Sequence, residues 1–506
     1  MAASADFKQR VNGNQILAVL LGASCLLGTI FAAYQMLMPS GTGVGNAQVH
    51  SPTMLNQKSN ASFHSRKSSE LYAWPSARGS VGSYLTSPYA GPAILTKPTW
   101  TWSYACCFMC KWCTMPFGTS IDGQKNIYLS AADGTRKFTP SGKLLWTSRR
   151  ENLEEFSSAV VLMDGAVYGI SEQARAFAID MDTGKDIWST KLPGGSDPTN
   201  GAVVAHQGVV IVGAEYVFDT PNNGASRKIF ALNGTDGSSL WDFTPDTPIW
   251  NFAGTFEVHD TFTYFVYQDL TGKVYCHFAN NGTLVWKAGG VPGSWTDGQA
   301  NLGPNGIVYG VSAYGSPFTA KEPLLSYSGF VSAYRVSDGK LLWARNVTNP
   351  PNSVPAVGMI TGQKKLSLVI PTGYSSSPGE LFVYAIDAET GEDQWIFQAP
   401  TSIIPGGLGD FSFQAMYQRK LNKIRPIALP NAWGTPMIDG EGAVFVGSEL
   451  GHFFRLQDLD GNGKISGSQE AQMIATEAGF NGCSSSAVAP GLLATSNFQS
   501  LLVWSY

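Results

Sequence analysis

One short pattern, repeated along the chain, constrains the fold more than any other feature of the sequence. At six places a tryptophan follows a glycine by four residues, and the copies recur roughly every 50 residues, the length of one β-propeller blade with its loops. Each glycine follows Ser, Thr, Asp or Asn, which is typical of tight hairpin turns that need a positive φ angle. The six pairs are Gly142 and Trp146, Gly184 and Trp188, Gly237 and Trp241, Gly282 and Trp286, Gly339 and Trp343, and Gly391 and Trp395. The pattern predicts an all-β chain of repeated blades.

The residues before each turn also follow a common order, best seen in AFAIDMDTGKDIW at 176–188. An alanine stands six residues before four of the glycines, where we expect it to lie opposite the tryptophan and leave room for the indole ring. These alanines are Ala178, Ala231, Ala333 and Ala385. Asp180, Asn233 and Asp387 stand four residues before the glycine, and we expect their side chains to accept backbone N–H bonds in the turn.

This order of alanine, acidic residue, TG or DG turn and tryptophan resembles the PQQ-type repeat of β-propellers. The resemblance covers about residues 95–506 and is most specific at 176–188 and at Ala385–Trp395. Three copies depart from it, because Arg136 and Cys276 replace the alanine in the first and fourth copies and Arg335 replaces the acidic residue in the fifth. We expect those three blades to be less regular.

The repeats also predict how many blades the ring contains. Two alternating apolar runs precede each turn, so each copy supplies four strands. A seventh unit runs from Trp433 to about Gly479, and the segment 485–506 matches only the first three strands of a unit. The run at 96–102 has the alternation of a fourth strand, and we expect it to close the ring beside 501–504, which hides both edges. The prediction is an eight-bladed propeller, with a seven-bladed ring as the fallback.

The N-terminal part has the features of a membrane tether. Residues 16–34 contain no charge and would span roughly 28 Å as a helix, close to the thickness of a hydrocarbon core. Lys8 and Arg10 precede this segment, so the positive-inside rule keeps the N-terminus in the cytosol. We predict a cytosolic tail at 1–15, a transmembrane signal-anchor at 16–38, a flexible stalk at 39–90, and the propeller at 91–506 in the secretory lumen or outside the cell. The alternative is secretion after signal cleavage.

In the seventh unit the tight turn is replaced by DLDGNGKISGSQE at 458–470, which resembles an EF-hand calcium loop. Oxygen-bearing residues at alternate positions suit Ca²⁺, and Gly463 stands at the sharp turn. Position 12 holds Gln469 where a bidentate glutamate is expected, and a small rotation of the helix predicted over 468–478 would bring Glu470 in. The predicted ligands are Asp458, Asp460, Asn462, the Lys464 carbonyl, Ser466, Gln469 and Glu470. The alternative is an enlarged polar hairpin with Asp458 at the place that Asp180 fills in the second copy.

Four closely spaced cysteines precede the first full blade: Cys106, Cys107, Cys110 and Cys113. In an oxidising lumen this cluster predicts disulfide bonds, and its CxxC spacing leaves a zinc or iron–sulfur site as the alternative. Cys276 and Cys483 are expected to be buried and inert, or to pair with one another. The sequons at Asn60, Asn233, Asn281 and Asn346 would be glycosylated only in a eukaryotic secretory lumen.

The net charge of -4 and a pI near 5.9 provide no broad basic surface, so nucleic acid is not an expected partner. The resemblance implies either a quinoprotein dehydrogenase with PQQ and Ca²⁺ or a non-catalytic scaffold such as an outer-membrane assembly lipoprotein. Cys106 and Cys107 resemble the adjacent-cysteine disulfide of some quinoproteins, but no acidic base or cofactor-binding residue can be placed, and no catalytic residue is assigned. The sequence favours a membrane-tethered extracytosolic propeller that binds or scaffolds a protein or glycan partner on one face. The alternative is a PQQ-dependent alcohol or sugar dehydrogenase.

Overall fold

The computed structural model describes the chain from residue 72 to residue 506, with gaps. The gaps are 83, 104–117, 132, 150–157, 196–202, 217–225, 251, 297, 315–327, 352, 374–380, 401–432, 449, 477, 481–484 and 498. None of the helices described is long and apolar enough to cross a membrane. The anchor predicted at 16–38, the sequon at Asn60, the cysteine cluster at 106–113 and Cys483 lie outside the described residues.

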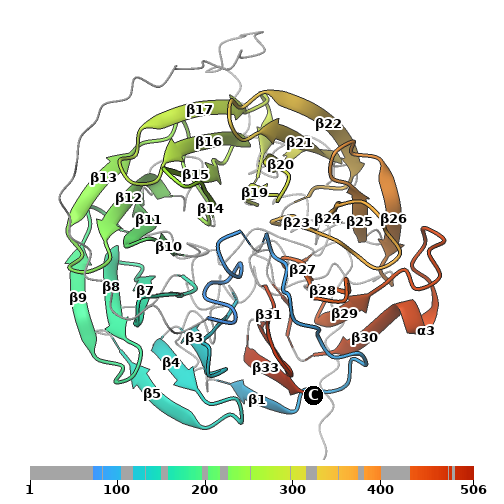
Figure 1. Ribbon diagram of the computed structural model, residues 1–506, viewed down its shortest axis with the longest axis horizontal. Coiled ribbons are helices and arrows are strands. Elements are labelled where there is room, and N and C mark those ends of the chain that lie inside the picture. Colours follow the sequence, from blue (N-terminus) through green and yellow to red (C-terminus); the bar gives the residue numbers. More distant parts are fainter. Residues whose placement is uncertain are drawn as a thin grey trace, which may run out of the picture.

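Eight small antiparallel sheets stand around a common axis, each running from an inner strand near the axis to an outer strand at the rim (Figure 1). In blades 1 to 7 the strands follow one another outward in sequence order, with two short strands sharing the inner edge of blade 5. The eight-bladed propeller predicted from the repeats is confirmed.

The strands of the first four blades are short and start at regular intervals. Blade 1 contains β2 (Ser120–Ile121), β3 (Ile127–Ala131), β4 (Gly134–Phe138) and β5 (Leu144–Ser148). Blade 2 contains β6 (Val161–Met163), β7 (Ala166–Ile170), β8 (Arg175–Asp180) and β9 (Asp186–Lys191). Blade 3 contains β10 (Val204–His206), β11 (Val209–Tyr216), β12 (Ser226–Asn233) and β13 (Ser239–Phe243). Blade 4 contains β14 (Thr255–Val258), β15 (Thr263–Gln268), β16 (Lys273–Phe278) and β17 (Leu284–Gly289).

The second half of the ring repeats this plan and adds one short helix. Blade 5 contains β18 (Ser294–Trp295), β19 (Asn301–Leu302), β20 (Ile307–Tyr314), β21 (Ser328–Arg335) and β22 (Leu341–Thr348). Blade 6 contains β23 (Ala356–Gly358), β24 (Ser367–Thr372), β25 (Phe382–Asp387) and β26 (Asp393–Gln398). Blade 7 contains β27 (Met437–Ile438), β28 (Val444–Gly447), β29 (His452–Leu456), α3 (Gly467–Glu470) and β30 (Ala471–Ala475). Blade 8 contains β31 (Ala487–Ala489), β32 (Leu492–Ser496), β33 (Ser500–Ser505) and β1 (Trp100–Ser103).

The glycine and the tryptophan of the repeat form the joint between neighbouring blades. The alanines lie opposite the tryptophans of their own blades, as predicted: Ala178 and Trp188, Ala231 and Trp241, Ala333 and Trp343, and Ala385 and Trp395. The indole of Trp188 then packs on Gly237 of the next blade, where an added Cβ would lie 2.5 Å from the ring. Gly237 is therefore needed for its φ of +71° and for the space that the neighbouring ring occupies.

The same joint recurs around the ring and includes a hydrogen bond from the indole. The Nε1–H of five repeat tryptophans donates to a backbone carbonyl of the following blade. These bonds join Trp146 to Met181 (3.0 Å), Trp188 to Gly234 (2.8 Å), Trp241 to Ala279 (2.9 Å), Trp286 to Val336 (2.6 Å) and Trp343 to Ala388 (3.3 Å). Each indole thus packs on the following blade and is hydrogen-bonded to it, which explains why glycine and tryptophan recur together.

The polar residues of the turns act as predicted. The side-chain oxygen of Asp180 accepts the N–H of Thr183 at 2.8 Å. The Oδ1 atoms of Asn233 and Asp387 accept the N–H groups two residues further on, at 2.9 and 2.8 Å. These short bonds hold each turn in the conformation that presents the glycine to the preceding blade.

Only part of the expected irregularity is found. In blade 1 the register differs by one residue, so that Lys137, and not Arg136, lies opposite Trp146. The turn is one residue tighter there, because the N–H of Gly142 bonds to the carbonyl three residues before it, whereas Gly184 bonds to the carbonyl four residues before it.

Blades 4 and 5 keep the regular register at the turn, so the predicted irregularity is not found in blade 4, and in blade 5 it is confined to the two short strands of the inner edge. Cys276 lies opposite Trp286 and fits the place of the alanine, because the thiol is also small. Arg335 keeps the turn bonds through its backbone, and its guanidinium contacts Asp338 at 2.9 Å.

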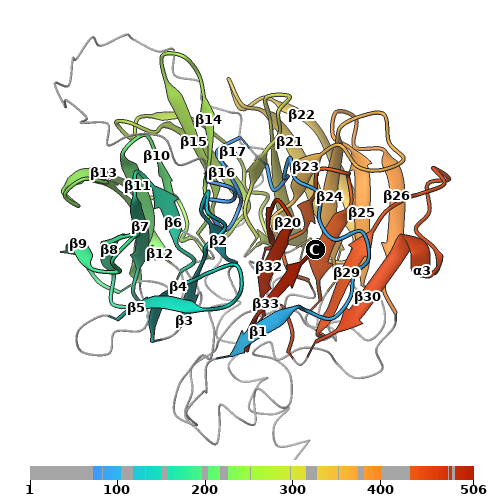
Figure 2. The same cartoon turned by 60° about the horizontal axis from the view of Figure 1, so that its bottom comes forward.

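The ring closes between strands from opposite ends of the described chain. β1 pairs antiparallel with β33, with Trp100 opposite Val503 and Trp102 opposite Leu501. Figure 2 shows these two strands side by side at the rim, next to the C-terminus. The closure predicted from 96–102 and 501–504 is confirmed, and it leaves no blade of the described ring without its fourth strand.

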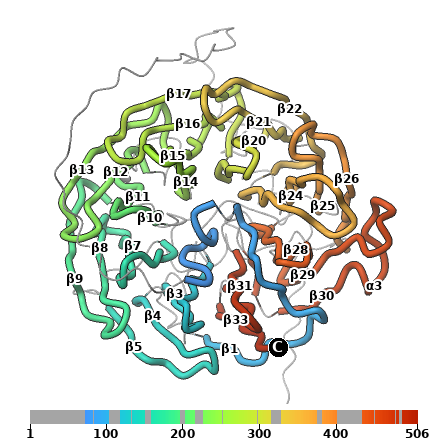
Figure 3. Tube along the Cα trace, viewed as in Figure 1, coloured from blue at the N-terminus to red at the C-terminus, as the bar shows by residue number. Residues whose placement is uncertain are grey.

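Residues 74–89, here called the axial segment, lie in the middle of the ring (Figure 3). The segment bonds to inner strands on several sides: Trp74 pairs with Ile121, and the carbonyl of Pro75 accepts the N–H of Leu162 at 2.7 Å. On the other side, the carbonyls of Tyr84 and Leu85 accept the N–H groups of Val357 and Ile438 at 3.0 and 2.9 Å. The predicted stalk extended to residue 90, whereas the chain makes ordered contacts with blades 1, 2, 6 and 7 from Trp74 onward.

Candidate metal centre

The loop predicted to bind calcium joins β29 to β30 at the outer part of blade 7. It replaces the glycine turn of the other blades and contains the short helix α3. Gly463 has a φ of +77° at the sharp turn, as predicted for the sixth position of the loop. The helix predicted over 468–478 is wrong beyond Glu470, because Ala471–Ala475 pairs with β29 as the outer strand of the blade.

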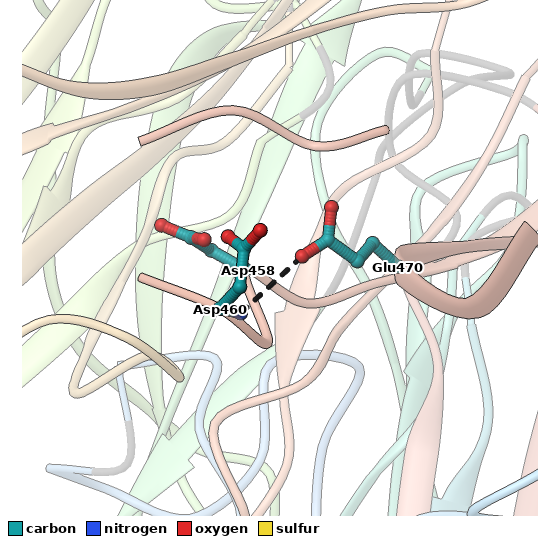
Figure 4. Close-up of side chains that lie close together, drawn as sticks. All are labelled: Asp458, Asp460 and Glu470. Atoms are coloured by element: carbon teal, nitrogen blue, oxygen red, sulfur yellow. Dashed lines mark hydrogen bonds between the residues drawn. The ribbon is translucent and has the colours of Figure 1, made fainter. Parts of the chain in front are cut away.

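Three carboxylates meet in this loop (Figure 4). Each of Asp458, Asp460 and Glu470 offers an oxygen, and these oxygens all lie within 4.8 Å of one another. Asp458 and Glu470 are buried, at 0% and 7% exposure, while Asp460 is exposed. Three negative charges this close repel one another, so the arrangement needs positive partners.

Backbone N–H groups provide part of that compensation. The two oxygens of Asp458 accept the N–H groups of Asn462 at 3.1 Å and Gly463 at 3.0 Å. Those of Glu470 accept the N–H groups of Leu459 at 2.9 Å and Ser466 at 2.9 Å. These bonds fold the loop around its carboxylates and leave oxygen lone pairs for a cation.

Three of the predicted ligands meet in the structure. Asp458, Asp460 and Glu470 are brought together, and Glu470 takes the position expected of Gln469, which is exposed. Asn462 borders the cluster, donating to Asp460 through its side chain at 2.7 Å and accepting the N–H of Lys464 through Oδ1 at 2.8 Å.

Two further predicted ligands, the Lys464 carbonyl and Ser466, follow Gly463 in the same loop. The side chains of Lys464 and Ser466 are exposed, and Ile465 points inward at 9% exposure, as predicted. The main chain of Lys464 pairs with Ile396 of blade 6 in a parallel bridge, a contact between blades that the sequence reasoning missed.

The register corrects one detail of the alternative interpretation of this loop. Gln457, and not Asp458, is the equivalent of Asp180. The N–H of Gln457 donates to the carbonyl of Glu470, just as the N–H of Asp180 donates to the carbonyl of Lys185 in blade 2. Asp458 is one residue further along and packs against Gly362 of blade 6, where a Cβ would lie 2.7 Å from the Asp458 carbonyl oxygen. No sequence signal in this loop could have indicated that neighbour.

A cluster of hard oxygens with three carboxylates is the ligand set that Ca²⁺ prefers. Asp458, Asp460 and Glu470 would hold the ion, and the exposed side of the loop leaves room for water ligands. Such an ion would supply positive charge to a buried group of carboxylates and stiffen the loop. The buried carboxylates and the bonds that fold the loop around them suit a structural cation.

The axis of the ring is the other place where a ligand could lie. Beside the axial segment remains a cavity of about 50 Å³, room for a few water molecules. Its lining includes Ser76, Arg78, Tyr84, Phe256 and Asn301. A three-ring quinone cofactor does not fit this space, because the chain itself occupies the centre of the ring.

The cysteine predictions are tested at one position. Cys276 is buried and free, and burial raises the pKa of its thiol well above the usual range, so it is inert as predicted. The disulfide and metal interpretations of the cluster at 106–113 concern residues that the structure does not describe.

The chain belongs to the PQQ-type repeat family described as outer membrane protein assembly factor BamB, whose profile matches residues 132–290 and 270–421, more than half of the sequence. Tetrathionate hydrolase of Acidithiobacillus ferrooxidans is 24% identical over 300 residues, which cover 48% of this chain and 58% of that protein. Outer membrane protein assembly factor BamB of Moranella endobia is 23% identical over 237 residues, which cover 44% of this chain and 54% of that protein. The match therefore spans a little over half the length of either relative.

Among solved structures, the quinohemoprotein alcohol dehydrogenase of Comamonas testosteroni is similar, with a TM-score of 0.55 and 13% identity. The similarity covers 85% of this chain and 80% of that enzyme. At this identity the likeness shows the propeller fold and not a shared activity.

Proposed function

We propose that the protein is a membrane-tethered, extracytosolic β-propeller that acts as a binding or scaffolding module for a protein partner, with a structural Ca²⁺ in the loop 458–470. The axial segment is the observation that carries this proposal. The channel at the axis is the concave site that a propeller offers to a small molecule. Here the described residues of the axial segment occupy much of it, which favours the two faces and the rim as ligand surfaces, and these suit a macromolecule. Membership of the BamB family supports a protein partner, and a glycan is the other outcome of the test.

A PQQ-dependent alcohol or sugar dehydrogenase is the second candidate, because a quinoprotein ethanol dehydrogenase of Pseudomonas aeruginosa is 29% identical to this chain over 112 residues. The cavity of about 50 Å³ at the axis argues against it. We derive no reaction step through the cofactor.

The test adds PQQ with Ca²⁺ to the purified full chain and follows the quinone absorbance and dye reduction with simple alcohols. We expect neither binding nor turnover. Stoichiometric PQQ binding with dye reduction would replace the scaffolding proposal with the dehydrogenase.

The partner is sought with photo-crosslinking residues placed at exposed apolar positions, in native membranes. Val258 and Met359, at 44% and 52% exposure, lie in or beside loops between inner strands of blades 4 and 6, and Leu341, at 52% exposure, lies at the rim of blade 5. A discrete protein adduct from one surface and not from the others supports the proposal. Adducts to glycan alone would change the partner class, and no adduct from any surface would contradict the binding role.

The tether is proposed from residues 16–38 and places the propeller outside the cytosol. Alkaline extraction should leave the full chain in the membrane pellet, and protease added from outside the cell or inside the lumen should degrade the propeller. Release of a shortened soluble chain would instead show cleavage of a signal peptide.

A further inference from the structure

Trp395 is an exception among the tryptophans of the repeat. It is buried at 2% exposure, and its Nε1–H has no hydrogen-bond partner among the described residues. The five repeat tryptophans before it all donate to a carbonyl of the following blade. Trp395 stands in the corresponding place on β26, facing blade 7, so the unpaired N–H lies at the joint between blades 6 and 7.

The loop 458–470 explains the difference. In blades 2 to 6 the acceptor carbonyl belongs to the residue three before the turn glycine, for example Val336 before Gly339. The register places Asp458 at that position of blade 7, because Gln457 pairs with Glu470 as Arg335 pairs with Lys340. The residue whose carbonyl would complete the joint is therefore also the first carboxylate of the metal centre.

The segment 457–465 contacts blade 6 at four further points. Lys464 pairs in parallel with Ile396 on the outer edge of β26. Ile465 belongs to the same apolar cluster as Trp395. The side-chain amide of Gln457 donates to the hydroxyl of Thr361 at 2.8 Å, and Asp458 packs against Gly362. The metal-binding loop of one blade thus covers the outer edge of its neighbour.

We propose that a divalent cation in the loop 458–470 locks blade 7 onto blade 6 at the outer strand β26. This inference rests on the calcium site of the proposed function. The cation offsets the repulsion between three carboxylates within 4.8 Å and holds Asp458 at the joint.

Hydrogen exchange of the full chain, with and without CaCl₂, tests the proposal within one molecule. The peptide that contains β26 (393–398) is compared with the one that contains β9 (186–191), the equivalent outer strand of blade 2. We expect Ca²⁺ to slow exchange in β26 by about tenfold, equivalent to ~1.4 kcal/mol of local stability, and to leave β9 unchanged. We call this cation-dependent contact between blades 6 and 7 the clamp. If Ca²⁺ slowed hydrogen exchange equally in β26 and β9, the clamp would be refuted, because the ion would then stabilise the whole ring.

Two variants separate the clamp from the metal site. Asp458→Asn should abolish both Tb³⁺ luminescence and the protection of β26. Ile465→Ala keeps all three carboxylates, so Tb³⁺ binding should persist within a few-fold while the protection of β26 is lost. If Ca²⁺ binds the native chain and β26 does not respond, the clamp is refuted and the metal site stands. If neither ion binds, both proposals fail.

Discussion

The strongest prediction concerns His277, a histidine buried inside blade 4. The ring is fully buried, its Nδ1–H donates to the carbonyl of Gly282 at 2.9 Å, and Nε2 has no partner among the described residues. It lies between aromatic rings, 5.6 Å from Tyr267 and 4.5 Å from Phe243. Burial lowers the pKa of His277 from 6.5 to about 4.

The sign of the effect follows from proton linkage. Below pH 6.5 the unfolded chain binds a proton at this histidine, and the folded chain does not until about pH 4. The stability that neutral His277 allows is therefore complete above pH 6.5 and is lost as the pH falls toward 4. A difference of about 2.5 units in pKa corresponds to about 3 kcal/mol.

The matched variant is His277→Ile, because Ile179 and Ile386 occupy the same position in blades 2 and 6. Urea unfolding at pH 7 and at pH 4 gives the acid-induced loss of free energy for each protein. The native chain should lose about 3 kcal/mol more than the variant, since all other titrating groups are common to both. Equal losses in the native chain and His277→Ile would refute the reasoning.

Three further predictions follow from the joints and from the axis. Gly237→Ala should lower the free energy of unfolding by about 1–3 kcal/mol more than Gly165→Ala, measured by thermal or urea unfolding. Both glycines have a positive φ, but only Gly237 packs against an indole, so equal losses would show that the indole contact is unimportant. Saturating Ca²⁺ should raise the Tm of the native chain by roughly 3 °C and leave Asp458→Asn unchanged, whereas Gln469→Ala should respond like the native chain. Deletion of the axial segment 74–89 should lower the Tm and increase protease sensitivity, because blades 1, 2, 6 and 7 lose backbone bonds; an unchanged melting curve would mean that the segment lies passively in the channel.

The propeller could be predicted from the sequence because its main joint is local in sequence. A turn glycine, a polar residue four places before it and a tryptophan four places after it lie within one hairpin, and their spacing reports the fold directly. The closure of the ring was predictable for a related reason, since one segment lacked a strand that another segment supplied. Arg136 in the place of the alanine indicated that blade 1 is irregular, but the form of the irregularity was not predictable, because a turn shortened by one residue leaves Gly142 and Trp146 at the same spacing.

The candidate site was predictable in its chemistry and less so in its geometry. The residue types of DLDGNG indicated hard-oxygen ligands, and three of the named carboxylates meet. The helix was overestimated because SQEAQMIATEA has good helix formers, whereas pairing with β29 decides the state of Ala471–Ala475. The axial segment was missed for a physical reason, because its Ser- and Gly-rich composition is that of a linker and its order comes from inner strands far away in the sequence.

The closure of the ring has a consequence for folding during synthesis. The indole of Trp504 donates a hydrogen bond to the carbonyl of Thr96, 408 residues earlier. The eighth sheet can therefore assemble only after residue 504 has left the ribosome. Until then blade 1 lacks its neighbour, blade 8. The loss of chain entropy on joining such distant segments makes the closure of the ring a slow final step. Nascent chains of this design therefore need protection from partners that would cap the waiting surface first.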